Sequence, residues 1–388
     1  MINKFTSSLI IIFLLCLGFY IAYRFEFSSS LSFSSVNKVT LLDEKVRVVE
    51  GNQAPIFILS IDGGGLNGII PIAVLQYIEE NSGIRIQEIF DLMVGTSSGG
   101  IVASLIATPD KSGKAKFNLT DIQAVFHQGA SKLFSASAYR DLLSLHGWIA
   151  PRYSVQKKYD LFNQYLPEMM LREALIPIAI PSFDYDNMEP IVFKSWTGDN
   201  YYMKDLLTAS TSAISFYAPS MIYSHTNKKN HELLDASLYL NSPEVVALLL
   251  AQKLYPEKKY IMVSLGAGMV DNDYFAESGK HWGILQWNIK FIRLMLFARM
   301  KFNAHIMRHL ITNKDDNVSS YHRFNITIPL GEVSGYDPSK QNIDKLDGYA
   351  RKIISKNKKS LTELIDLIKD QHKNIESNSL KLTGEKVK

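Results

Sequence analysis

The chain has almost no cysteine and no strong excess of either charge. Its single cysteine among 388 residues, Cys16, cannot form an intrachain disulfide, so the fold must be stable without cross-links, and the cysteine count leaves the compartment open. The formal net charge is +4 and the pI about 8.8, which is too weakly basic to predict nucleic-acid binding but is compatible with an anionic membrane surface. With 46% hydrophobic and 21% charged residues, the composition is that of a folded protein.

An apolar run near the amino terminus is the clearest targeting signal. It covers 15 residues, 9–23, which is long for the core of a signal peptide and short for a full membrane span. Three interpretations stay open: residues 1–27 are an uncleaved anchor, a cleaved signal segment, or a buried helix. The first predicts a membrane-associated protein and the second a secreted one. The serine-rich residues 28–53 are expected to form a linker.

Beyond the linker, short β-branched runs alternate with helical patterns. This alternation predicts an α/β fold in three layers, with a mostly parallel central sheet and helices on both of its faces. The strands that we expect are 56–61, 90–94, 260–265 and 321–328, with a hairpin formed by 176–185 and 189–196. The helices that we expect are 69–80, 99–107, 206–213, 283–311 and 344–372.

The same pattern suggests a division of the chain. Residues 54–270 are expected to be the domain core, because they contain most of the alternating strands and helices. Residues 271–372 are expected to be a helical part of the same domain. Residues 373–388 are expected to be a polar, frayed tail.

A glycine-rich turn at residues 62–68 (DGGGLNG) lies directly between an expected strand and an expected helix. Gly63, Gly65 and Gly68 fit the pattern G-x-G-x-x-G, in which backbone N–H groups face an anion at a helix N-terminus. This motif alone leaves open a dinucleotide-binding loop or an oxyanion hole for a tetrahedral intermediate. The dinucleotide interpretation needs an acid at the end of the next strand, whereas Asp91 is expected to begin that strand.

A second turn, residues 95–100 (GTSSGG), has the pattern G-x-S-x-G of a nucleophile elbow. Gly95 and Gly99 would relieve crowding where the chain reverses, so that the Ser97 hydroxyl stands exposed at a helix N-terminus. The alternative is an ordinary helix cap rich in glycine and serine. The two turns together favour an acyl hydrolase, because that chemistry needs both a nucleophile and donors for an oxyanion.

The general base is less obvious than the nucleophile. Asp235 follows a short apolar run, and a partly buried carboxylate near Ser97 could take its proton directly. The alternative is an aspartate that only caps the next segment. A histidine base is possible by chain order, but none of the downstream histidines lies between a strand end and glycines: His281, His305, His309, His322 and His372. The spacing of His305 and His309 fits a metal site, but no acid accompanies them, so we expect solvated residues and no metal.

At this point the sequence resembles the patatin-like phospholipase family, most clearly over residues 57–268. That family has a D-G-G-G-x-[RK]-G loop, a G-T-S-[ST]-G-G elbow, and a D-G-[GA] signature with Asn and Pro six and eight residues after the Asp. Further shared segments are an A-[TS]-x-A-A-P-x-[YF]-F-x-P stretch and an S-L-G-T-G strand end. The corresponding positions here are Asp62 to Gly68, Gly95 to Gly100, Asp235 with Asn241 and Pro243, 209–219, and 264–268.

The resemblance implies a Ser–Asp dyad without histidine. Ser97 would attack the acyl carbonyl and Asp235 would be the base, while the N–H groups of Gly63, Gly64 and Gly65 would hold the oxyanion. It implies a phospholipid or another acyl lipid as substrate, at a membrane surface, and it implies no cofactor. The reaction would be that of a phospholipase A or lysophospholipase.

Two positions depart from the family pattern. Asn67 stands where the family usually has Arg or Lys, and Ala236 and Ser237 replace Gly-[Gly/Ala] after the aspartate. If Ala236 adopted a positive φ, strain of about 1–2 kcal/mol could tilt Asp235 away from Ser97. These departures leave open a second possibility, a catalytically weak or partner-activated protein that acts by binding lipid or another protein.

Residues 280–314 contain basic residues and no acid, with aromatic residues between them. One interpretation is a basic amphipathic helix on an anionic bilayer. The other is a helix packed on the domain with a solvated basic face. The basic residues are Lys280, Lys290, Arg293, Arg299, Lys301, Arg308 and Lys314.

Overall fold

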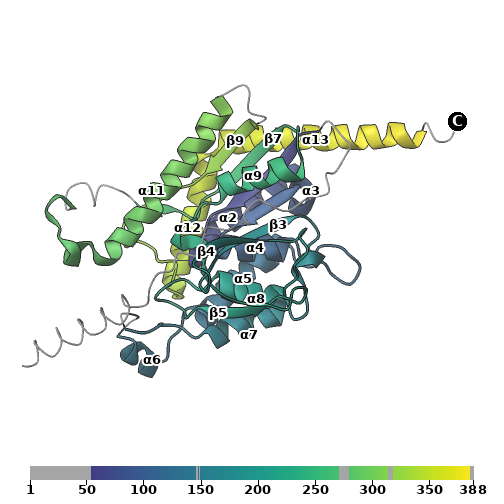
Figure 1. Ribbon diagram of the computed structural model, residues 1–388. Coiled ribbons are helices and arrows are strands. Elements are labelled where there is room, and N and C mark those ends of the chain that lie inside the picture. Colours follow the sequence, from purple (N-terminus) through teal and green to yellow (C-terminus); the bar gives the residue numbers. More distant parts are fainter. Residues whose placement is uncertain (1–53, 146, 148, 271–278, 313–317, 385–388) are drawn as a thin grey trace, which may run out of the picture. The chain divides into compact units, whose positions relative to one another are not determined.

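The computed structural model describes residues 54–384, apart from 146, 148, 271–278 and 313–317 (Figure 1). The predicted anchor at 1–27 and the linker at 28–53 therefore lie outside the described residues. Among the helices that are described, none is both long enough and apolar enough to span a bilayer.

The described residues form a central sheet of eight strands in the order β5-β6-β3-β2-β1-β7-β9, with β4 paired to β3. The pairs β3–β2, β2–β1, β1–β7 and β7–β9 are parallel, as the alternation of strands and helices predicts. The strands are β1 (Ile56–Ile61), β2 (Leu92–Gly95), β3 (Ile178–Asp184), β4 (Glu189–Lys194), β5 (Ser220–Tyr223), β6 (Asn230–Asp235), β7 (Tyr260–Leu265) and β9 (Val318–Phe324). A short pair, β8 (Met269–Val270) with β10 (Thr327–Ile328), lies apart.

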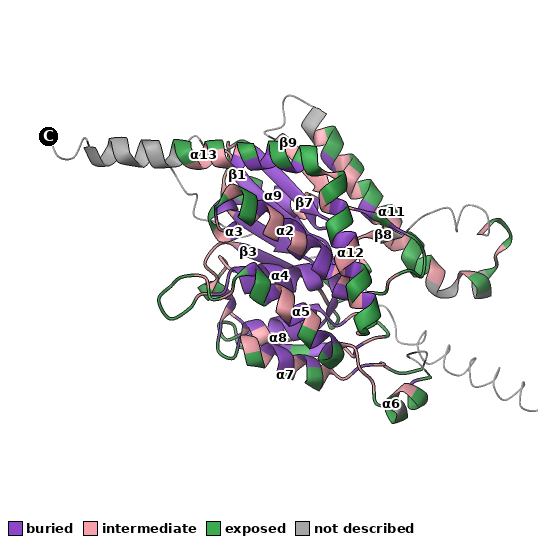
Figure 2. Cartoon of the chain, turned by 180° about the vertical axis from the view of Figure 1, so that it is seen from behind, coloured by how far each residue is buried: buried purple, intermediate pink, exposed green. Residues whose placement is uncertain are grey.

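Helices cover both faces of this sheet, and the buried strands lie between them (Figure 2). One layer contains α2, α4, α5, α8, α12 and α13, which contact one another in series, and the other contains α9 packed against α11. The helices are α2 (Ile69–Ser82), α3 (Ile86–Ile89), α4 (Ser98–Ile106), α5 (Leu119–Leu133), α6 (Ala138–Leu143), α7 (Val155–Tyr165), α8 (Met203–Ser210), α9 (Glu244–Leu254), α11 (Ile284–Thr312), α12 (Lys340–Lys356) and α13 (Lys358–Gly384). The predicted three-layer α/β fold is confirmed.

The central strands are buried on both faces, which explains their continuous apolar runs. Every residue of β7 is buried, and β1 is buried from its second residue onward. Strands covered by helices on both sides need apolar side chains at every position instead of an alternating pattern. The bounds predicted for β1 and β7 agree with the structure at both ends.

Three predictions about the carboxyl-terminal third were wrong. The single strand expected at 321–328 is divided between β9 and β10, because the Asn325 side chain accepts hydrogen bonds from the Gly268 and Ile326 N–H groups and replaces strand pairing there. The single helix expected at 344–372 is two helices that meet at Asn357, whose N–H caps α12. The tail expected from residue 373 is helical as far as Gly384.

Candidate active site

Ser97 lies at a sharp turn between β2 and α4. Its φ of 53° and ψ of −120° are rare for a residue with a side chain, and such strain is typical of functional turns. Among residues 92–100, Ser97 is the one that is not buried. The hydroxyl-bearing residue therefore stands out from an otherwise enclosed turn, as the sequence predicts for a nucleophile elbow.

The glycines that flank Ser97 are required by close backbone contacts. A Cβ on Gly95 would lie 2.2 Å from the carbonyl carbon of Gly99, and a Cβ on Gly99 would lie 2.3 Å from the Ile61 oxygen. Both distances are far below any carbon contact, so a side chain at either position would force the turn apart. Glycine is therefore required at both positions, because α4 packs closely against the ends of β1 and β2.

Asp235 reaches the same turn from an antiparallel strand. The pairing of β3 with β2 ends at Ala179, but β3 continues to Asp184 beyond the carboxyl end of β2. Strand β6 pairs with this extension in the antiparallel direction, with Asp235 opposite Ser182. It therefore runs back toward the sheet edge and ends beside the elbow.

The Asp235 carboxyl group is held in a fully buried position. Its Oδ1 accepts a hydrogen bond of 2.8 Å from the Ser237 N–H. Burial raises the pKa of Asp235, while the Ser97 hydroxyl, Ser237 and the positive charge of Lys158 oppose that rise. Within the described part of the chain, the buried Oδ2 atom has no well-formed hydrogen-bond partner, so the contact with Ser97 falls short of good hydrogen-bond geometry. Ser97 and Asp235 are thus brought together, with one carboxylate oxygen still open.

The replacement of glycine by Ala236 does not strain this loop. Ala236 begins a short 3₁₀ helix (Ala236–Leu238) and does not have a positive φ. The expected possibility of a strained Ala236 that tilts Asp235 away is therefore wrong. The other departure, Asn67, has a buried Oδ1 atom with no hydrogen-bond partner within the described part of the chain.

The glycine loop has fewer open donors than the sequence suggests. The Gly63 N–H donates to the Asn241 oxygen over 2.9 Å, and the Gly64 N–H donates to the Ser98 hydroxyl over 3.0 Å. An N–H group has one proton to donate, so neither is open to an oxyanion in this conformation. Gly65, at a positive φ of 59°, borders the cavity next to Ser97 and Ser98. Of the three predicted donors, Gly65 is the one that fits, and the Ser98 N–H at the start of α4 joins it as a candidate.

The remaining motif residues connect the glycine loop to the segment before α9 and to α5. The Asn241 side chain donates to the Gly63 oxygen over 3.1 Å, in addition to the main-chain bond between these two residues. Pro243 occupies the N-cap position of α9. A Cβ on Gly68 would lie 2.5 Å from the Phe126 ring, which places α5 against the loop.

Arg323 anchors the loop and was not foreseen from the sequence. It lies on β9, where its guanidinium binds both carboxylate oxygens of the fully buried Asp62 and donates to the Ser264 hydroxyl over 2.7 Å. Glu244 joins this group by accepting from Ser264 and Tyr321. No motif pointed to Arg323, because it lies 261 positions from Asp62 in the chain.

A narrow, mostly apolar cavity begins at Ser97. Its enclosed volume is about 30 Å³, room for about two water molecules. Tyr336, on the loop before α12, lines it and stacks on Phe216 with ring centroids 3.9 Å apart. The described residues that line it include no histidine: Gly65, Leu66, Ser97, Ser98, Ile101, Phe126, Leu133, Phe134, Lys158, Phe162, Thr211, Ala213, Tyr217 and Tyr336.

The structure argues against the dinucleotide interpretation of the glycine loop. Asp91 precedes β2, and its Oδ2 accepts from the Phe57 N–H over 2.8 Å at the amino end of the sheet. Burial raises the pKa of Asp91 to about 6, against the opposing hydrogen bond from Phe57. The loop lies at the carboxyl end, so this acid cannot reach a ribose bound there.

His305 and His309 are both exposed on α11.

Comparison with known proteins agrees with this arrangement. A family model described as patatin-like phospholipase matches residues 59–248. Patatin-like protein 2 of Arabidopsis thaliana is 28% identical over 265 residues, covering 59% of this chain and 64% of that protein, less than two thirds of its length. Patatin-like protein 4 of the same plant is 24% identical over 335 residues, covering 77% and 83%. Among solved structures, VipD from Legionella pneumophila has a TM-score of 0.30 at 12% identity, covering 83% of this chain and 72% of that one.

Fold, elbow and glycine loop therefore define an α/β protein of the patatin-like class. The chain belongs to the patatin-like phospholipase family. The predicted family resemblance is confirmed.

Proposed function

We propose that this protein is a lipid acyl hydrolase that cleaves fatty-acyl esters through Ser97 and Asp235. The observation that carries the proposal is the buried Asp235 carboxyl group beside Ser97, with one oxygen that has no well-formed partner among the described residues. An open carboxylate at a serine in an elbow is the arrangement that a base needs to take the hydroxyl proton. Family membership supports an acyl ester of a lipid as the substrate class.

The proposed reaction has two steps. The Ser97 oxygen attacks the acyl carbonyl while its proton moves to Asp235, which then protonates the leaving alcohol. The developing oxyanion is held by the N–H groups of Gly65 and Ser98, and a few kcal/mol from each such donor is the usual contribution. Water then hydrolyses the acyl-enzyme with Asp235 again as base.

The cavity supports an acyl chain as the group next to the scissile bond. Its walls are largely aliphatic and aromatic side chains from α4, α5 and α7. The enclosed volume of the cavity is only about 30 Å³, so a fatty-acyl chain can enter only if the aromatic side chains rearrange. Tyr336 is the candidate to move, because it lies on a loop instead of a helix or strand. The structure thus corresponds to a closed form of the site.

The direct test is fatty-acid release from mixed phospholipid vesicles by the full-length chain. We expect release by the wild type and its loss in Ser97→Ala, because removal of the nucleophile leaves only the background of the binding site. Release that persists in Ser97→Ala would sink the mechanism. A wild type that binds these vesicles without any turnover would favour instead the lipid-binding protein suggested by Asn67.

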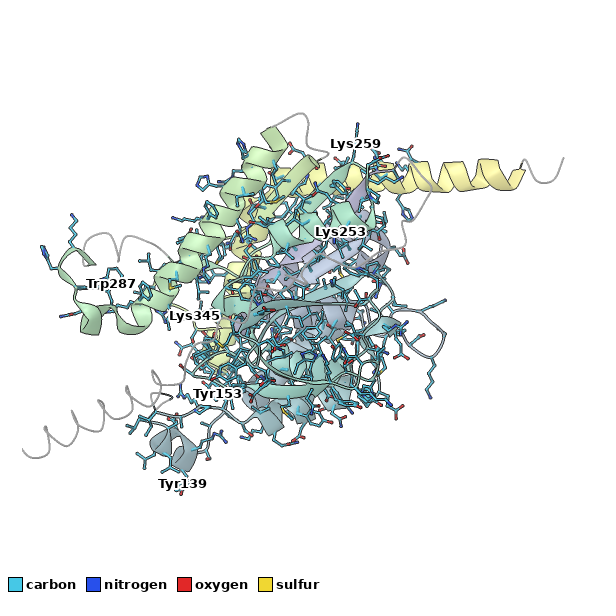
Figure 3. All side chains as sticks on the ribbon, viewed as in Figure 1. Tyr139, Tyr153, Lys253, Lys259, Trp287 and Lys345 are labelled. Atoms are coloured by element: carbon cyan, nitrogen blue, oxygen red, sulfur yellow. The ribbon has the colours of Figure 1, made fainter. Side chains whose placement is uncertain are left out.

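We further propose that the chain docks on an anionic lipid surface through α6 and α11. Helix α6 exposes Tyr139 and Leu142, at 74% and 69%, and α11 exposes Phe291 and Phe302 among its basic residues. Figures 1 and 2 place α6 and the first turns of α11 on one side of the molecule, where Figure 3 labels Tyr139 and Trp287. Apolar side chains beside cations match a bilayer with anionic headgroups.

This surface adjoins the cavity. The N–H groups of Arg152 and Tyr153, which follow α6, donate to the oxygens of Ser215 and Phe216 over 3.3 and 2.8 Å. Those acceptors lie between Ala213 and Tyr217, which line the cavity. Arg152 also donates to the Asp141 carboxylate of α6 over 2.8 Å, so α6 is connected to a segment that borders the cavity.

Vesicle flotation tests the docking surface. With vesicles of phosphatidylcholine and about 30% phosphatidylglycerol, we expect Leu142→Asp/Leu143→Asp to bind at least about tenfold more weakly than the wild type, because each leucine loses about 1.5–3 kcal/mol of burial. Leu249→Asp, an exposed leucine on α9, is the matched control and should bind normally. Equal binding by the α6 variant and the wild type, in chains that both begin at residue 37 and so lack the amino-terminal run, would contradict the docking proposal.

A further inference from the structure

Helix α7 contains a lysine that is almost completely enclosed. Lys158 is 1% exposed, and lysines are almost never fully buried unless they are paired. Its Nζ donates to the Ser212 hydroxyl over 3.0 Å and lies 3.8 Å from the centroid of the Tyr217 ring. The face of a tyrosine ring attracts an ammonium group, and this attraction opposes the burial that lowers the pKa of Lys158 well below its usual value.

Ser212 connects this lysine to the dyad. Its side chain accepts from Lys158, while its main-chain oxygen accepts from the Asp235 N–H over 3.1 Å. Lys158 and Ser97 also line the same cavity. The ammonium group therefore lies close to both members of the dyad without belonging to it.

The other titratable groups around Asp235 carry no compensating charge. Burial is the larger cause, and the negative charge of Asp235 the smaller, of a raised pKa at Tyr239 and at Tyr336. Both phenols therefore stay neutral. Arg293 acts on Tyr336, from an exposed position on α11. Lys158 is the cation whose charge acts on Asp235 directly among the described residues.

We propose that Lys158 is a positioning residue of the site, whose ammonium group is the counter-ion that keeps Asp235 ionised as the base. This inference rests on the proposed function and deepens it. A dyad without histidine needs a carboxylate that is both buried and charged at neutral pH, and those two requirements conflict. Lys158 reduces the conflict, because a nearby opposite charge favours the ionised form and so lowers the pKa that burial raises.

Lys158 and Asp235 shift each other's pKa in the directions expected of an ion pair. Burial raises the pKa of Asp235, and the charge of Lys158 lowers it. Burial lowers the pKa of Lys158, and the charge of Asp235 raises it. Each group therefore favours the ionised form of the other, and removal of Lys158 leaves the burial of Asp235 opposed only by the hydrogen bonds from Ser97 and Ser237.

The test is the pH dependence with which a fluorophosphonate probe labels Ser97 in the full-length chain. This reaction needs the base but no lipid. In Lys158→Met we expect the acidic limb of the rate profile to move up by about 1–3 pH units, the effect of removing a nearby opposite charge. At a fixed pH on that limb, the labelling rate of Lys158→Met should therefore be about tenfold below that of the wild type for each pH unit of the shift. Lys157→Met, the exposed neighbour on α7, is the matched control and should keep the wild-type profile.

The outcomes separate this inference from the proposed function. The position of the limb does not depend on the fraction of folded protein, so a merely structural role for Lys158 would lower the amplitude and leave the limb in place, which would overturn the inference. Labelling of Ser97 without lipid hydrolysis would overturn the proposed function and leave the Lys158 result valid. No labelling of the wild type at any pH would overturn both.

Discussion

Asp235→Asn is expected to lower kcat/KM for fatty-acid release by about three orders of magnitude, within the range of a lost general base. Asparagine has nearly the same shape, and its amide oxygen can still accept from the Ser237 N–H as the Oδ1 atom does now. Its amide nitrogen would face Ser97 and cannot take the hydroxyl proton. The rate of fluorophosphonate labelling at Ser97, measured beside lipid hydrolysis, should fall by a similar factor.

The same variant should unfold at a temperature close to that of the wild type, because relief of the buried Asp235 charge is offset by loss of the charge that supports the buried Lys158 ammonium group. Burial raises the pKa of Asp235 in the folded protein above its value in the unfolded chain. Ionisation of Asp235 therefore lowers the free energy of unfolding. This loss begins as the pH rises past the pKa of the unfolded chain and is complete above the pKa of the folded protein. Asparagine removes the effect, and the two proteins should become alike in acid.

Asp91→Asn is the matched control, because Asp91 is also buried with a raised pKa but lies at the opposite end of the sheet. Its activity should match that of the wild type. Full activity of Asp235→Asn, or equal losses in both variants, would show that Asp235 is not the base.

Arg323→Met should have the largest effect on stability. It would leave the Asp62 carboxylate fully buried without its guanidinium partner, and such a loss destabilises a protein by about 3–5 kcal/mol. Denaturant unfolding monitored by circular dichroism measures this change. The folded fraction should also be a poorer hydrolase, because Asp62 begins the glycine loop that presents Gly65.

Arg351→Met provides the comparison, because Arg351 is exposed on α12 and surface changes of this kind stay within about 0.5 kcal/mol. In the double variant Asp62→Leu/Arg323→Met, part of the lost stability should return, because the buried Asp62 charge is removed, whereas Glu244, whose carboxylate lies 3.8 Å from the guanidinium, loses that cation in both variants. If the single and double variants were equally unstable, the ion pair would not be what anchors the loop.

The parts of the fold that could be predicted are those that depend on neighbouring residues. The bounds of β1 and β7 follow from apolar runs that two helical layers must cover, and the elbow at Ser97 follows from glycines that a tight reversal requires. Both signals are local in the chain. They also fix the nucleophile without any knowledge of distant contacts.

The parts that could not be predicted depend on contacts between distant residues. The bonds that occupy the Gly63 and Gly64 N–H groups come from Asn241 and Ser98, so the true number of open donors is not visible in the loop itself. Strand β5 has only four residues and alternates between buried and exposed, which is too short a pattern to recognise. Arg323 resembles any other arginine in a β-strand until its partner is known.

The site brings together residues from Asp62 to Tyr336, and this has a consequence for the order of events during synthesis. A growing chain contains Ser97 well before Asp235, and it lacks the arginine anchor until residue 323 has been made. The Gly335 oxygen, which accepts from the Leu66 N–H over 2.8 Å, arrives later still. A ribosome-bound fragment therefore carries Ser97 without a finished glycine loop, and the proposed activity is expected only once both ends of the domain have joined.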